Sequence, residues 1–156
     1  MLYALYALAL LAGIVAGSRT LTAPAAVGWA AHLGFIDLDG SWLAFMGDKW
    51  TVTVLTLLAF VEMIADQMPS TPSRKVPLQF GARIVSGGFS GATLGASGGS
   101  WIAGVVAGVI GAVIGAYGGA ELRARMAKAI GRDPTAGLIE DVGVIVLALA
   151  IVFALQ

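Results

Sequence analysis

The chain has no cysteine, one histidine and few charged residues. Charged residues make up 12% of its 156 residues. Without cysteine the chain cannot form disulfides, zinc–thiolate sites or iron–sulfur clusters, and thiol catalysis is also excluded. Soluble domains carry about 25% charged residues, so this chain has too few charges to cover a water-facing surface. The shortage of charge therefore argues against a soluble enzyme.

The chain also lacks an excess of basic residues and the common catalytic motifs. Nine Lys and Arg balance nine Asp and Glu, so the formal net charge is zero and nothing indicates nucleic-acid binding. The sequence contains no HExxH zinc motif, no Walker loop and no GxSxG nucleophile turn. We therefore expect no enzymatic activity, no cofactor and no nucleic-acid partner.

Apolar residues are abundant instead. They make up 58% of the chain, and the mean hydropathy is +0.91. A membrane-spanning helix needs about 20 apolar residues. Six segments are candidates: 2–17, 22–36, 50–65, 80–96, 101–118 and 138–155. The sequence thus predicts one domain, 1–156, that is an all-α integral membrane protein with about six transmembrane helices; the short segment 22–36 either spans or is re-entrant.

Several residues at the segment ends carry helix-boundary signals. Thr22 and Ser100 are predicted to cap the second and fifth helices, and Asp133 before Pro134 is predicted to cap the sixth. Proline disrupts a helix interior, so residues 68–78 are predicted to stay out of regular helix because they contain three prolines: Pro69, Pro72 and Pro77.

The basic residues predict an orientation. With six spans, the loops 18–21, 66–79 and 119–133 fall on one side and hold seven of the nine basic residues. Basic loops stay in the cytoplasm. We therefore expect a multi-pass protein of the bacterial inner membrane with both termini outside.

Three spans precede the Pro-rich loop 67–79 and three follow it. The halves, 1–66 and 80–156, would insert with opposite orientations, which is the formal requirement for an inverted repeat. The sequence similarity between the two halves is weak, because the matching residues align in two incompatible registers. A 3+3 inverted repeat is therefore kept as an open interpretation.

Glycines recur at helical spacing in two of the segments. Small residues on one face let helix backbones approach closely in a membrane. Three interpretations are open: packing inside one subunit, a homo-oligomer contact, and a water-lined path. The residues are Gly87, Gly91 and Gly95, and then Gly104, Gly108, Gly111 and Gly115.

Six charged residues fall inside or at the edges of the segments, and we call them the charge cluster. They are Arg19, Glu62, Asp66, Arg83, Glu140 and Asp141. Charges within a span cost about 2.5–3.5 kcal/mol each. One interpretation is an ionic latch in which the arginines pair with the carboxylates and tie helix ends together. A second is a cation or proton site, favoured by four acids against two arginines. A third is an anion site at Arg19.

Motifs along nearly the whole chain resemble the domain of unknown function 4126 family, which consists of small bacterial membrane proteins. The matching motifs are Gly17-Ser18-Arg19-Thr20, Pro24-Ala25, Glu62, Ala65-Asp66, Pro69, Arg83, Ser86-Gly87, the Gly-rich fifth segment and Glu140-Asp141. Gln67 stands where the family pattern has a lysine. The resemblance implies the fold and carries no activity.

The leading functional hypothesis is membrane passage of a small ion or solute, linked to cations or protons through the charge cluster. The alternative is a structural or lipid-binding membrane protein that does not transport. A transporter needs a polar path from the cluster to both faces, whereas an ionic latch needs mutually paired and sealed charges. The expected partners are the lipid bilayer, the small ion or solute and, through the glycine faces, a second copy of the chain.

Overall fold

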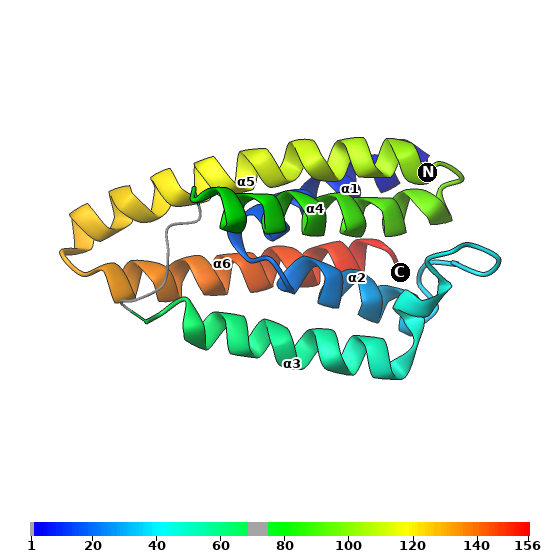
Figure 1. The fold of residues 1–156 in the computed structure, drawn as a ribbon, viewed down its shortest axis with the longest axis horizontal. Helices are drawn as coiled ribbons and strands as arrows, with labels where there is room; N and C mark the ends of the chain where they lie inside the picture. The colour runs from blue at the N-terminus through cyan, green and yellow to red at the C-terminus, as the bar shows by residue number, and fades with distance from the viewer. Residues whose placement is uncertain (1, 69–74) are drawn as a thin grey trace.

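The described residues form a bundle of helices (Figure 1). The computed structural model describes residues 2–68 and 75–156, and within these it contains six α-helices, one short 3-10 helix and no strand. The helices are α1 (Leu2–Ser18), α2 (Thr22–His32), η1 (Ala44–Gly47), α3 (Lys49–Ala65), α4 (Pro77–Ser97), α5 (Trp101–Ile130) and α6 (Asp133–Ala154). Two of them, α5 and α6, are long and apolar enough to cross a membrane.

Successive helices run back and forth along the long axis. Figure 1 shows both termini, the loop around η1 and the α4–α5 turn at one end of the bundle. The α5–α6 turn lies at the opposite end, and the α1–α2 turn lies inside the bundle. This back-and-forth order is the one that the six apolar segments predict.

Several predicted boundaries are wrong for local reasons. Helix α5 continues to Ile130, whereas 119–133 was expected to be a loop. That stretch has neither proline nor glycine between 120 and 130, and Arg125 bonds to Glu121 one turn away at 2.8 Å. Pro77 begins α4, because proline is tolerated in the first helical turn.

The predicted caps are right in one case and displaced in two. Ser100 accepts from Ala103 N and caps α5 as expected. Thr22 and Asp133 are the first residues of their helices, and the cap positions before them hold Leu21 and Arg132 without a side-chain cap bond. The predictions for Pro69 and Pro72 lie outside the described residues.

Helices α1, α4 and α5 pack backbone to backbone through glycine. A β-carbon on Gly91 would overlap the carbonyl oxygen of Gly104, and one on Gly108 would overlap that of Gly87. On the adjoining face of α5, Gly111 and Gly115 lie equally close to the α1 backbone. The predicted glycine faces are therefore packed inside the subunit, where even alanine would force the backbones apart.

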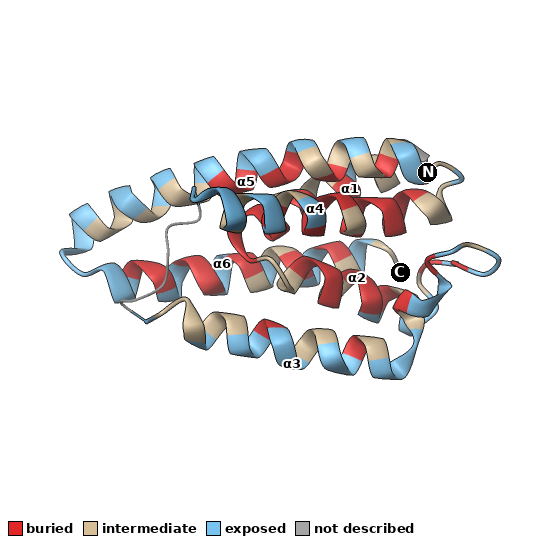
Figure 2. Cartoon of the chain, viewed as in Figure 1, coloured by how far each residue is buried: buried red, intermediate tan, exposed pale blue. Residues whose placement is uncertain are grey.

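Helix α3 packs far more loosely. Only Val52 and Ala59 are buried among its 17 residues, and Figure 2 shows most of its surface as intermediate or exposed. It contacts α2, which has only 11 residues, and η1. The central core lies between α1, α2, α4 and α6, around residues such as Val15, Val27 and Leu94.

The two halves of the chain do not match as repeats. Their second helices would correspond under an inverted repeat, yet α2 has 11 residues and α5 has 30. Glycines join α4 closely to α5, whereas α2 turns away from α1 and packs on α3. The structure thus gives the 3+3 interpretation no support.

Candidate functional site: a charge cluster around a helix break

The charge cluster surrounds the break between α1 and α2. Only residues 19–21 separate the two helices, and Ser18 and Arg19 are buried. A helix end leaves carbonyls without intrahelical partners, and a helix start leaves N–H groups without them. A buried break must therefore find partners for both kinds of group within the protein.

Glu62, in the last turn of α3, satisfies the N–H groups at the start of α2. Its two carboxylate oxygens accept hydrogen bonds from Thr20 N at 2.7 Å and Leu21 N at 2.8 Å. A negative charge is also favoured at a helix N-terminus by the helix dipole. Both oxygens of this predicted ion ligand are thus engaged by the backbone.

Arg83 serves the other side of the break. Its guanidinium donates to the carbonyl oxygens of Ser18 at 2.6 Å and Gly17 at 3.2 Å, at the end of α1. The positive charge complements the negative end of that helix. Arg83 is 3% exposed, and its nearest carboxylate oxygen belongs to Asp66 at 3.9 Å. The expected acidic partner is therefore present but secondary to the carbonyls.

Arg19 joins three parts of the fold. It donates to Asp66 at the end of α3 and to Asp141 in α6, and Gln67 donates to the second oxygen of Asp141 at 2.9 Å. Arg19 is 1% exposed. Burying an unpaired charge is very costly, so its position depends on both carboxylates. The ion pairs tie the helix break to α3 and α6.

Glu140 precedes Asp141 in α6 and lies beside a further arginine. Arg123 Nη1 of α5 lies 3.9 Å from a Glu140 oxygen, and Arg123 also pairs with Asp133 at 2.8 Å. Arg123 falls in the predicted loop 119–133, so the sequence does not predict this role. The Glu121–Arg125 spacing could have revealed the helix that carries it.

The structure brings all six predicted residues to one region and changes the balance of charge. Backbone N–H groups compensate Glu62, and Arg123 lies beside Glu140 although it is shared with Asp133. Among the described residues, no group of three or more His, Asp or Glu side chains is arranged to hold a metal ion. The excess of acids that favoured a cation is therefore reduced.

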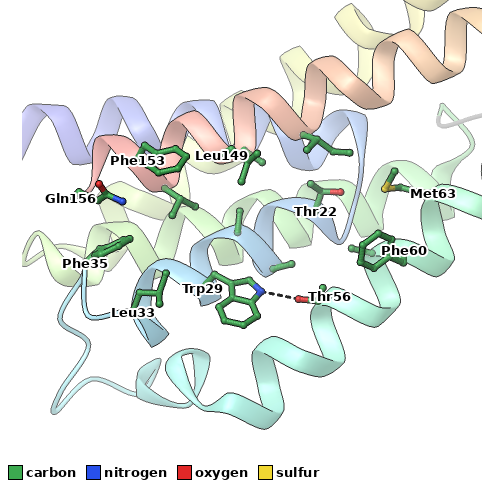
Figure 3. Close-up of a pocket in the computed structure, with 16 residues that line it drawn as sticks. Thr22, Trp29, Leu33, Phe35, Thr56, Phe60, Met63, Leu149, Phe153 and Gln156 are labelled. Atoms are coloured by element: carbon green, nitrogen blue, oxygen red, sulfur yellow. Dashed lines mark hydrogen bonds between the residues drawn. The ribbon is translucent and has the colours of Figure 1, made fainter.

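A second feature lies beside the cluster, between α2, α3 and α6 (Figure 3). It is a groove of about 460 Å³, and we call it the α3–α6 groove. Figure 3 shows aromatic and aliphatic side chains from all three helices pointing into it, including Trp29, Phe60, Leu149 and Phe153. The Trp29 indole N–H donates to Thr56 at 2.9 Å. The groove is thus almost wholly apolar.

Comparison with known families identifies the chain. The model of the domain of unknown function 4126 (DUF4126) matches residues 6–154. The chain belongs to this family. No curated protein and no solved structure matches it. Because the DUF4126 description names no activity, any function has to be argued from the geometry.

Proposed function

We propose that this DUF4126 protein is a multi-pass protein of the bacterial inner membrane that does not transport, and that its charge cluster is an ionic latch. A membrane location is supported by α5 and α6, which are long and apolar enough to span. It is also supported by large apolar side chains that face outward along α5, among them Val106, Ile110 and Ile114. Contiguous apolar surface of this kind is unfavourable in water.

One observation carries the latch: Arg19 is buried between the carboxylates of Asp66 and Asp141. Inside a bilayer, backbone groups at a helix break have no water to bond. Glu62 and Arg83 provide that bonding for the α1–α2 break, while Arg19 connects the break to α3 and α6. The charges stabilise a chain reversal that an apolar bundle could not otherwise bury.

Passage of a cation or a proton-coupled solute is the second candidate. One observation favours it: Asp66 lies near both Arg19 and Arg83, keeps 15% side-chain exposure, and follows the most loosely packed helix. Movement of α3 would open the cluster at this residue. Carboxylates within spans mark ion and proton pathways in pumps and transporters.

A flux and stability screen separates the two candidates. The protein is reconstituted in proteoliposomes, and cation, anion and proton flux is measured for wild type and Glu62→Gln. Melting temperature is followed over a panel of mono- and divalent cations. The latch predicts no flux and no specific cation response in either protein. A cation-dependent rise in melting temperature that is lost in Glu62→Gln, together with flux, would favour transport.

Single cysteines test the proposed orientation, because the chain has none of its own. Ser41→Cys lies in the loop between α2 and α3, which carries Asp37, Asp39 and Asp48, and Ala129→Cys lies in the basic last turn of α5. Basic segments stay in the cytoplasm. An impermeant maleimide should therefore label Ser41→Cys in intact cells and should reach Ala129→Cys only after lysis. Equal labelling of both in intact cells would contradict the topology.

A further inference from the structure

We propose that the α3–α6 groove holds one acyl chain of a phospholipid with an ammonium headgroup, phosphatidylethanolamine. This inference rests on the proposed membrane location and does not depend on whether the charge cluster transports. The groove volume of about 460 Å³ lies within the roughly 300–1,000 Å³ usual for ligand sites. Three helices form the walls of the groove, so it surrounds an occupant on more sides than a single exposed helix face does.

The shape of the groove sets the direction of the bound acyl chain. At one end α3 and α6 are joined through Arg19, which bonds to Asp66 and Asp141, and by Gln67, which bonds to Asp141. Figure 1 shows α3 and α6 separating from there toward the end that holds both termini. A lipid must keep its headgroup in water, so the headgroup lies at the open end and the terminal methyl points toward the charge cluster.

The lining matches an acyl chain along its length. Ile145, Leu149 and Phe153 recur every four residues along α6 and form one wall. At 1.5 Å per residue they cover about 12 Å. Phe60 and Met63 of α3 form the opposite wall. The Trp29 N–H already has Thr56 as its partner, so an apolar occupant leaves this donor satisfied.

Charge complementarity at the open end selects the headgroup. Phe35 lines the groove near that end, and the chain that follows carries three carboxylates, Asp37, Asp39 and Asp48, against one lysine, Lys49. An acidic loop attracts an ammonium group and repels a headgroup with net negative charge. The geometry therefore favours phosphatidylethanolamine over phosphatidylglycerol.

Native mass spectrometry tests the site directly. The purified full chain is delipidated in detergent and then offered dioleoyl phosphatidylethanolamine, dioleoyl phosphatidylglycerol or oleic acid. Wild type should retain one phosphatidylethanolamine, with weaker retention of phosphatidylglycerol and of oleic acid. Ala26→Phe, which fills the groove floor on α2, should lose the bound lipid. Val146→Phe, on an exposed face of α6 outside the lining, should keep it.

Loss of lipid by Ala26→Phe supports the site only if this variant still folds. If Ala26→Phe fails to fold by circular dichroism, Leu149→Trp fills the same groove from its exposed wall and should lose the lipid. Equal retention by the groove-filling and Val146→Phe variants would overturn the site, as would preference for oleic acid or phosphatidylglycerol, or a second protein copy in place of lipid. Failure of the ionic latch would appear in the stability of charge variants, which this experiment does not measure.

Discussion

The two sides of the bundle are held together in different ways. On one side α1, α4 and α5 pack so closely that Gly91, Gly108 and Gly111 leave no room for a β-carbon. On the other side α3 buries two residues, borders the α3–α6 groove and is tied to its neighbours by polar contacts at its inner end. Backbone packing fixes the first side, whereas a few charged groups position the second. Substitutions that add bulk and substitutions that remove charge should therefore act on different sides.

Apart from loss of the Arg19 ion pairs, the largest effect is expected where the backbones touch. Gly111→Leu should destabilise the protein by about 3 kcal/mol or more, because overpacking forces helices apart and the backbone of α1 lies against this position. Gly111→Ala should also be destabilising. The measurement is melting temperature in detergent, with Ile110→Leu on the exposed neighbour as the control. An unchanged melting temperature for Gly111→Leu would remove the distinction between the two sides.

The next effect is expected at the helix break. Glu62→Gln should destabilise by about 1.5–3 kcal/mol, the range for a hydrogen bond to a charged group. An amide has only one acceptor oxygen, and Glu62 receives two backbone N–H groups. Chemical or thermal unfolding measures the change. Glu121→Gln, on the exposed part of α5, is the control and should lose little, because exposed ion pairs contribute about 0–1 kcal/mol. Equal effects would mean that Glu62 does not support the break.

The smallest effect is expected on the outer face of α3. Leu57→Ala should change stability by no more than about 0.5 kcal/mol, because this side chain is exposed. Val52→Ala on the same helix removes a buried side chain and should cost more despite the smaller change in volume. Both are compared by unfolding in the same detergent. A larger loss for Leu57→Ala would show that α3 has a partner on that face.

The sequence predicts the helices better than the site. Apolar runs fix where the six helices lie, and the glycine spacing identifies the packed faces, because both signals are local. The sequence does not predict the end of α5, because the last turns of this helix are polar and are typical of a loop in composition. The sequence predicts the charge cluster as a set, because charged side chains within apolar segments need partners of opposite charge. The partners of Glu62 and Arg83 cannot be predicted from the sequence. They are backbone N–H and carbonyl groups, which almost every residue type carries.

A charge-deletion series measured by unfolding tests whether Arg19 is held as one member of a buried ionic latch. Arg19→Leu should destabilise by about 3–5 kcal/mol, because it leaves Asp66 and Asp141 without their common cation. The triple variant Arg19→Leu, Asp66→Leu and Asp141→Leu should recover most of that loss, since apolar side chains can replace a buried ion group. A triple variant no more stable than Arg19→Leu alone would contradict the latch.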